Sequence, residues 1–323
     1  MSYVYLAPMV GWTTTLFRQM IQVFHPDARV FTEMLTVQSL VYGRQFAKLR
    51  TSDKDHDVIV QLAGSEPSQF SACEEFSDLF HGFDEINLNV GCPSSKVQNA
   101  QMGACLMYEP ERVAKCLKAL KVLRKPVSVK CRIGVDNQTQ DDLFRFIEAC
   151  MAHTNKFYVH ARYAWLNGIN PKQNRSIPPI QYDVAEILAE RYPMNTFIIN
   201  GELQDYVHTK KFLSDKRFGG VMIGRAAYQN PWLFYQLSTQ DGFSGRAAEF
   251  LDDLLQCTAR ELDWFKAFTT LTRGIPGGKK LRQYLADNKM ADLRHLRGEI
   301  LAKLSLKAKT YQTYKEEVPK EYV

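Results

Sequence analysis

The chain has 323 residues, a formal net charge of +6, 45% hydrophobic residues and 24% charged residues. The length allows one large domain and a small one, the composition is typical of a globular protein, and the modest charge permits an anionic partner without demanding one. No apolar run reaches the ~20 residues that a membrane helix needs and the first residues carry no secretory signal, so we expect a cytoplasmic protein without a membrane partner.

Eight apolar runs bounded by turn residues predict eight strands. They occupy residues 4–9, 29–34, 57–64, 85–91, 127–134, 156–162, 196–201 and 219–225. Most of these runs are continuous rather than alternating, which is typical of strands that are covered on both faces. The pattern therefore indicates a sheet buried beneath helices.

Segments between the predicted strands carry helical spacing. Residues 109–123 and 182–192 are examples, and the second places Val184, Ile187 and Leu188 on one face. Eight strands alternating with helices over roughly 225 residues predict a (β/α)8 TIM barrel. A doubly wound α/β sheet is the alternative, but it usually carries a GxGxxG fingerprint after its first strand, and this sequence has none.

Beyond about residue 240 the strand pattern ends. Helical spacing follows in segments such as 247–268 and 290–311, with a Gly- and Pro-containing loop at 272–280. We therefore expect a TIM-barrel catalytic domain over residues 1–240 and a small all-α domain over residues 241–323.

The helical tail is basic. Residues 273–309 carry ten Lys or Arg against three Asp or Glu. This excess fits either a solvated helical face or a surface that binds nucleic-acid phosphates. The seven cysteines (73, 92, 105, 116, 131, 150 and 257) form no CxxC pair and no Cys/His cluster, so we expect neither a metal site nor a disulfide framework.

Polar residues recur at the C-terminal ends of the predicted strands, where barrels place their active sites. In chain order they are Pro8 and Met9, Glu33, Gln61, Asn89 with Cys92, Lys130 and Arg132, His160 and Arg162, Asn200 with Gly201 and Glu202, and Gly224 with Arg225. His160 or Cys92 alone is more often a structural residue. Their shared location favours one polar cavity.

The last two strand ends suit a phosphate, because Gly201 and Gly224 allow close backbone approach and Arg225 supplies charge. Lys130 and Gln61 suit the polar edge of a flat heterocycle, and a lysine there would stabilise an anionic reduced flavin. The residues by themselves thus predict a phosphate-bearing cofactor such as FMN at the barrel mouth.

A series of motifs follows in order along the chain. It comprises LAPMVGWT (6–13), TEM (32–34), VQLAGS (60–65), DEINLNVGCPSSKVQNAQMGACLM (84–107), VKCRIG (129–134), HARYAWLNGINPKQNRSIPP (160–179), INGE (199–202) and VMIGRAAYQNPW (221–232). Together the motifs resemble the tRNA-dihydrouridine synthases, and the stretch over 160–179 is similar to their bacterial A-type subfamily, which modifies uridines 20 and 20a of the tRNA D-loop. The resemblance implies an FMN-binding TIM barrel followed by a small helical domain.

The resemblance also implies residue roles. FMN would be bound by Ala7, Pro8, Met9, Gln61, Lys130, His160, Asn200, Gly201, Glu202, Gly224 and Arg225. The substrate tRNA would be contacted by Asn89 at the target uridine and by Arg162, Arg175, Lys279 and Arg282. NADPH would reduce FMN, the flavin N5 hydride would pass to C6 of uracil, and Cys92 would be the catalytic acid that protonates C5.

Some points differ from the family pattern or stay open. Glu202 stands where many relatives have Gly or Asp, and Lys279 stands where relatives often have Arg, which removes a bidentate contact. Trp165 could stack on a base or pack its loop. Residues 94–103 are expected to form a mobile loop carrying Cys92 to the substrate, and we expect a monomer.

Two other functions remain as alternatives. A small-molecule reductase on an FMN barrel would share the phosphate site and Lys130, but it would not need the basic tail. A non-catalytic tRNA-binding module would explain the tail but not Lys130, Gln61 and Cys92 at a barrel mouth. Flavin absorbance in the purified protein would separate the second alternative from the enzymes.

Overall fold

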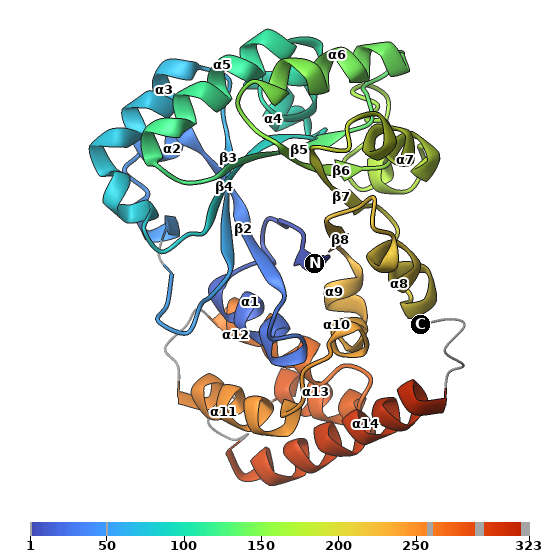
Figure 1. Ribbon diagram of the computed structural model, residues 1–323. Coiled ribbons are helices and arrows are strands. Elements are labelled where there is room, and N and C mark those ends of the chain that lie inside the picture. The colour runs from blue at the N-terminus through green and yellow to red at the C-terminus, as the bar shows by residue number, and fades with distance from the viewer. Residues whose placement is uncertain (1, 50, 257–260, 288–293, 318–323) are drawn as a thin grey trace.

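The computed structural model describes residues 2–49, 51–256, 261–287 and 294–317. Its centre is a closed barrel of eight parallel strands in chain order, so the predicted TIM barrel is confirmed (Figure 1). The strands are β1 (Tyr3–Leu6), β2 (Arg29–Thr36), β3 (Val58–Ala63), β4 (Glu85–Val90), β5 (Val127–Arg132), β6 (Lys156–His160), β7 (Thr196–Asn200) and β8 (Gly220–Ile223). Each overlaps a predicted apolar run, although the ends differ by up to three residues.

Helices cover the barrel and then form a separate layer. The helices up to β8 are α1 (Thr15–Phe24), α2 (Val37–Val41), α3 (Pro67–Ala72), α4 (Ser95–Asn99), α5 (Pro110–Leu120), α6 (Gln140–Met151), α7 (Tyr182–Arg191) and α8 (Tyr206–Ser214). After β8 come α9 (Ala226–Gln229), α10 (Trp232–Leu237), α11 (Phe243–Gln256), α12 (Glu261–Leu271), α13 (Gly278–Asp287) and α14 (Arg297–Glu317). The predicted helical tail is therefore present.

Strand β4 shows how a mostly apolar strand can also supply polar side chains to the barrel interior. Successive side chains of a strand point to opposite faces. Ile86 and Leu88 pack into the main core between the barrel and its helices. The alternate residues Glu85, Asn87 and Asn89 are buried among polar partners inside the barrel. One face of the strand thus stabilises the fold while the other supplies polar groups to the interior.

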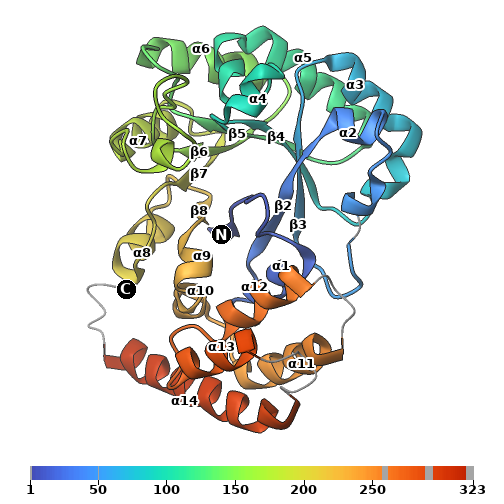
Figure 2. The ribbon, with the colours of Figure 1, turned by 180° about the vertical axis from the view of Figure 1, so that it is seen from behind.

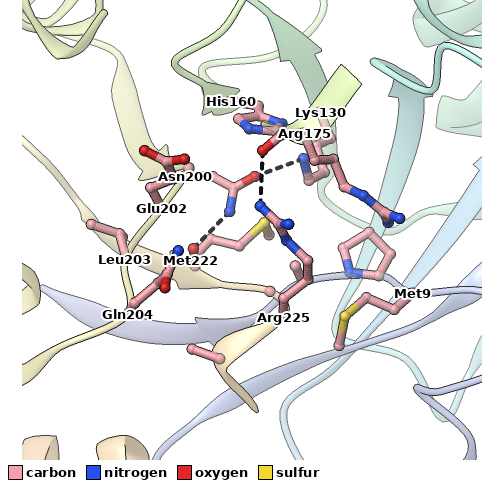
Figure 3. Close-up of a pocket in the computed structure, with 15 residues that line it drawn as sticks. Met9, Lys130, His160, Arg175, Asn200, Glu202, Leu203, Gln204, Met222 and Arg225 are labelled. Atoms are coloured by element: carbon pink, nitrogen blue, oxygen red, sulfur yellow. Dashed lines mark hydrogen bonds between the residues drawn. The ribbon is translucent and has the colours of Figure 1, made fainter. Parts of the chain in front are cut away.

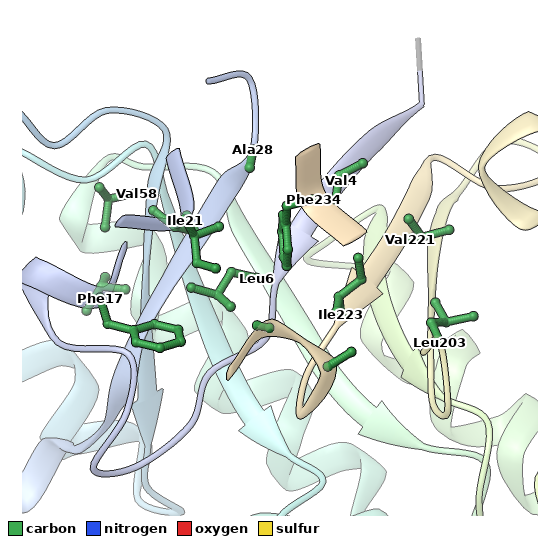
Figure 4. Packing of buried hydrophobic residues seen from close by; sticks show 14 of the residues in the cluster. Val4, Leu6, Phe17, Ile21, Ala28, Val58, Leu203, Val221, Ile223 and Phe234 are labelled. Atoms are coloured by element: carbon green, nitrogen blue, oxygen red, sulfur yellow. The ribbon is translucent and has the colours of Figure 1, made fainter. Parts of the chain in front are cut away.

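The helical tail docks on the barrel beside α1. Figures 1 and 2 both place α11 and α12 next to α1, and α14 lies against α11. The intervening layer is apolar: Phe17 and Ile21 of α1 and Phe234 of α10 lie beside Leu6 of β1 (Figure 4). Lys266 of α12 also donates to the Gly11 carbonyl in the loop after β1. The tail therefore supports a loop at the barrel mouth.

Three details differ from the sequence expectation. In α7 the buried residues are Val184, Ala185, Leu188 and Ala189, whereas Ile187 is 39% exposed, so its predicted place on the buried face is wrong. The expected loop over 94–103 contains the short helix α4. The helix α13 begins within the loop expected over 272–280.

Parts of the tail prediction fall outside the described residues. The segment 247–268 contains α11 and α12 on either side of residues 257–260, which are not described and include Cys257. Lys289 and Asp292 of the basic segment also lie outside the described residues. Across the described residues, no helix is long and apolar enough to cross a membrane.

Candidate active site

A pocket opens at the C-terminal mouth of the barrel (Figure 3). It is lined by Ala7, Pro8, Met9, Lys130, His160, Arg175, Asn200, Gly201, Glu202, Leu203, Gln204, Met222, Gly224, Arg225 and Ala226. Every residue predicted to bind the cofactor is in this lining except Gln61, and Arg175 joins them. The tertiary structure thus gathers residues from β5, β6, β7 and β8 and from the loop after β1, while their roles stay predictions.

Lys130 and Asn200 form the floor of this pocket. The Lys130 ammonium donates to Asn200 Oδ1 at 3.1 Å, and Asn200 Nδ2 donates to the Met222 carbonyl at 2.7 Å (Figure 3). Burial, with Arg132 nearby, lowers the pKa of Lys130 to about 8. An anion in the pocket would favour the protonated lysine, so this group suits a ligand that carries or gains negative charge.

His160 ends β6 beside the turn after β7. Burial, followed by the cationic neighbours Arg132 and Lys130, holds the pKa of His160 well below its usual range, so its imidazole is neutral. Gly201 has φ +123°, and a Cβ there would lie 2.6 Å from Ile180 Cδ1 and 3.0 Å from His160 Cδ2. A glycine is needed for the backbone to pass this closely.

Charge is distributed unevenly around the turn after β7. Glu202, with φ +48°, forms an ion pair with Arg162, whose side chain is 2% exposed. Arg225 donates to the Arg175 carbonyl at 2.8 Å, and both arginines line the pocket. Because Glu202 neutralises Arg162, the cationic character of the pocket comes from Lys130, Arg175 and Arg225.

The pairing of Arg162 bears on its predicted role. The sequence assigned Arg162 to tRNA and Glu202 to the cofactor. In the structure the two side chains form an ion pair with each other. A direct contact of Arg162 with tRNA stays a prediction that this buried position does not favour.

Cys92 lies in a turn after β4 that is fixed from two sides. The backbone N–H groups of Gly91 and Cys92 donate to Asn89 Oδ1 at 3.2 and 3.1 Å. Ala104 donates to the Cys92 carbonyl at 2.9 Å. A Cβ at Gly103, which has φ +73°, would lie 2.5 Å from that carbonyl. The turn and the start of the following segment therefore close tightly around a half-buried thiol.

Gln61 lies beside this turn rather than in the pocket lining. Its Oε1 accepts from Asn89 Nδ2 at 2.9 Å, and its Nε2 donates to Asn87 Oδ1 at 2.8 Å. Asn89, predicted to contact the target uridine, is buried and has one Nδ2 hydrogen beyond the bond to Gln61. Gln61, predicted to bind the cofactor, is thus hydrogen-bonded through Asn89 to the turn that carries Cys92.

Arg132 and Asn174 organise the mouth; the sequence placed Arg132 among the strand-end residues without a role and did not single out Asn174. Arg132 donates to the carbonyls of Gly91 at 3.2 Å, Tyr163 at 3.2 Å and Asn174 at 3.1 Å. Burial lowers the pKa of Arg132 to about 9. The side-chain amide of Asn174 in turn bonds the backbone of Trp165. Arg132 follows Lys130 at strand spacing, which is the signal that could have identified it.

The two predicted tRNA contacts in the tail differ in their surroundings. Lys279 is exposed, whereas Arg282 is half-buried and donates to the Thr272 carbonyl at 2.7 Å. Burial lowers the pKa of Arg282. Trp165, left open between stacking and packing, is 37% exposed. Arg282 therefore supports the tail itself, and Lys279 is the freer candidate for a nucleic-acid phosphate.

Metal-ligating residues do not gather in this region. Within the part of the chain that the structure describes, no group of three or more His, Cys, Asp and Glu side chains is arranged to hold a metal ion.

Comparison with known proteins places the chain in a family. A model described as Dihydrouridine synthase (Dus) matches residues 5–316. The chain is 38% identical over 297 residues to the tRNA-dihydrouridine(20/20a) synthase of Shewanella oneidensis, covering 88% of each chain. It is 37% identical over 298 residues to the tRNA-dihydrouridine(20/20a) synthase of Escherichia coli K12, covering 88% of this chain and 85% of the relative.

Two solved structures share the fold. A 2-naphthoyl-CoA reductase complex is similar with a TM-score of 0.52 and 11% identity, covering 82% of this chain and 55% of the other. Histamine dehydrogenase from Rhizobium sp. 4-9 is similar with a TM-score of 0.52 and 12% identity, covering 86% and 48%. These likenesses concern the barrel fold. The family match and the sequence relatives extend over most of the chain, and the protein belongs to the dihydrouridine synthase family.

Proposed function

We propose that this protein is a flavin-dependent tRNA-dihydrouridine synthase that reduces the C5–C6 double bond of uridine at positions 20 and 20a of the tRNA D-loop. The observation that carries the proposal is the juxtaposition of two groups at one barrel mouth. One is a cationic pocket with a close-approach glycine, Gly201, and the other is a thiol held in a turn by Asn89. Relatives named for modification at positions 20 and 20a support the choice of substrate.

The pocket residues fit FMN. Gly201 leaves room for a close approach that a Cβ would block, whereas a Cβ at Gly224 would meet only Ala7, at an ordinary contact distance of 3.8 Å. Arg225 offers charge for the phosphate, and Lys130 offers a donor for the polar edge of the ring. Together with Gln61 and His160, these residues would hold the cofactor at the mouth.

The chemistry needs a reductant and an acid. FMN, once reduced by NADPH, would supply the hydride that C6 of uracil receives. The chain's own contribution is the proton for C5, which the Cys92 thiol can donate from the turn held by Asn89. Lys130 would stabilise negative charge at the pocket floor. His160, being neutral, can hydrogen-bond there without adding charge.

The target base must leave its stack to reach this depth. Asn89 retains one Nδ2 hydrogen, which can donate to a uracil carbonyl beside Cys92. Arg175 at the rim can neutralise a phosphate next to the extruded nucleotide. In the tail, exposed Lys279 can bind the RNA backbone away from the target base.

The test uses unmodified tRNA transcripts with purified protein, FMN and NADPH, and measures dihydrouridine by mass spectrometry. A matched transcript with cytidine at positions 20 and 20a serves as the control. We expect dihydrouridine in the first transcript and none in the second. Equal product in both would refute the position assignment, and a protein that binds no FMN would refute the flavin chemistry. Reduction of free uracil in preference to tRNA would favour a small-molecule reductase.

A further inference from the structure

A chain of buried polar side chains runs through the barrel interior to the Cys92 turn. Its links are Ser128 Oγ to Glu85 Oε1 at 2.5 Å, Asn87 Nδ2 to Ser128 Oγ at 2.8 Å, Gln61 Nε2 to Asn87 Oδ1 at 2.8 Å, and Asn89 Nδ2 to Gln61 Oε1 at 2.9 Å. The backbone N–H groups of Gly91 and Cys92 then donate to Asn89. All five side chains are buried. The chain thus spans β3, β4 and β5.

The two ends of this chain fix its direction. An ionised carboxylate only accepts hydrogen bonds, and a backbone N–H only donates. Glu85 receives further donors from Lys156 at 2.5 Å and Tyr158 at 2.9 Å, so it is the terminal acceptor. Every amide between Glu85 and Cys92 must therefore donate toward Glu85. A reversed amide would set donor against donor or acceptor against acceptor.

This direction determines which hydrogen-bonding groups the amides have left for a ligand. Gln61 commits its oxygen to Asn89 and one N–H to Asn87, which leaves one N–H. Asn89 commits its oxygen to the Cys92 turn and likewise retains one N–H. Both amides are thereby fixed as donors, which matches the carbonyl groups of a flavin ring and of a uracil.

Packing alone does not require this polar filling. The adjoining part of the barrel interior is an apolar cluster that includes Tyr5, Phe31, Ile198 and Met222. A buried ion pair is weak evidence for stability, since apolar side chains of similar volume often stabilise as well or better. A directional chain that ends at the reacting thiol therefore points to a role in the site.

We propose that Glu85, four residues before Asn89 on β4, is a positioning residue. It orients the Gln61 and Asn89 amides as donors and holds the Cys92 turn through the hydrogen-bond chain. The inference rests on the proposed function, because it is FMN and uracil that the two donors would meet. Glu85 itself contacts neither of them.

The test compares two interrupting variants with a matched control. Ser128→Ala removes the link next to Glu85 and leaves the Glu85–Lys156 ion pair in place. Glu85→Gln replaces the terminal carboxylate, which only accepts, with an amide that can also donate to Ser128 and so reverse the direction of the chain. Tyr158→Phe is the control, because it removes one donor to Glu85 without interrupting the chain. Thermal unfolding of each variant establishes that it is folded, and Ser128→Ala carries the test if Glu85→Gln does not fold.

Two measurements report on position rather than on turnover. The first is the dissociation constant for FMN, followed by flavin fluorescence. We expect it to rise about tenfold in both interrupting variants, as loss of an oriented hydrogen bond implies, and less than about twofold in Tyr158→Phe. The second is the alkylation rate of Cys92 by iodoacetamide in protein without FMN, read from the Cys92 peptide. We expect this rate to rise several-fold as the turn loosens.

The outcomes separate the inference from the proposed function. Unchanged FMN affinity and unchanged Cys92 alkylation in Ser128→Ala would overturn the positioning role. Equal changes in Tyr158→Phe would overturn it too, because they would reflect general loosening of the barrel. A wild-type protein that binds no FMN would instead refute the proposed cofactor. The alkylation measurement would still test the position of Cys92.

Discussion

At the residue scale, the barrel mouth combines a fixed cationic pocket with a thiol in a turn. Lys130 and Arg225 line the pocket, and Cys92 lies in a turn held through Asn89 and Gly103. The two groups have separable tasks in the proposed reaction. Removing the proton donor should leave cofactor binding intact, whereas removing a cationic side chain should weaken cofactor binding.

The first prediction concerns Cys92. Cys92→Ala should lower the rate of uridine reduction about a hundredfold or more, because it removes the proton donor, while the FMN dissociation constant stays within about twofold. Dihydrouridine formed per minute under saturating NADPH is the measurement. The matched control is Cys105→Ala, whose thiol donates to the Met102 carbonyl at 3.1 Å in a neighbouring helical turn. Loss of activity in the control alone would contradict the assignment.

The second prediction concerns pH. The pKa of Lys130 is lowered to about 8 by burial, and only the protonated ammonium attracts an anionic ligand. FMN affinity should therefore be roughly constant below pH 8 and fall as pH rises above it, by up to about tenfold per unit. Titrating FMN binding between pH 7 and 9.5 measures this. Lys130→Met should bind FMN more weakly, and its FMN affinity should not decline above pH 8. If the affinity of this variant still declined, the pH dependence would belong to another group.

At the element scale, the turns after the strands decide how closely a ligand can approach. The turn after β7 holds Gly201 at φ +123° against Ile180 and His160. This backbone conformation and this proximity both exclude a Cβ. In helix α7, the small residues Ala185 and Ala189 lie on the buried face, whereas the larger Ile187 is 39% exposed.

The third prediction tests this turn. Gly201→Ala should destabilise the fold by about 1–3 kcal/mol and abolish measurable FMN binding, since the added Cβ is strained and displaces His160. Chemical denaturation and fluorescence titration provide the two measurements. Gly245→Ala is the control: this glycine lies in α11 with no neighbour within 4 Å of an added Cβ, so the change should stabilise by about 0.5–1 kcal/mol. Retained FMN binding in Gly201→Ala would refute the close-approach argument.

At the scale of the whole molecule, the helical tail is part of the mouth. Figure 2 shows α12 beside α1, and Lys266 of α12 reaches the Gly11 carbonyl and lies 5.3 Å from the Trp12 ring centroid. Trp12 stacks on Tyr228 with centroids 4.2 Å apart. The tail thereby supports the loop that carries Pro8 and Met9 and also provides exposed lysines.

The fourth prediction concerns RNA binding by the tail. Lys279→Ala should weaken tRNA binding severalfold and reduce the slope of log affinity against log salt by about one, while FMN binding is unchanged. Filter binding at several salt concentrations measures both quantities. Lys118→Ala, which removes another exposed charge, on α5, controls for net charge. An equal effect in both variants would indicate non-specific attraction, and Arg282 is unsuitable for this test because it supports the Thr272 carbonyl.

The amino-acid sequence by itself determined the barrel, the helical tail and most of the pocket. Strand patterns and the turns that follow them are local signals, and a parallel barrel brings all strand ends to one mouth. Residues such as Lys130, His160 and Gly201 could therefore be found without coordinates. The domain boundary near residue 240 and the residue roles stay predictions.

Only the tertiary structure decided how these side chains pair. Arg162 and Glu202 form an ion pair, Arg132 binds three backbone carbonyls, and Glu85 ends the chain that leads to Cys92. These partners lie on different strands or in loops far apart in sequence. Their contacts depend on the register between strands and on the course of the loops, which no local pattern encodes. The sequence thus determined where the chemistry gathers, and strand register decided which side chains are left free to perform it.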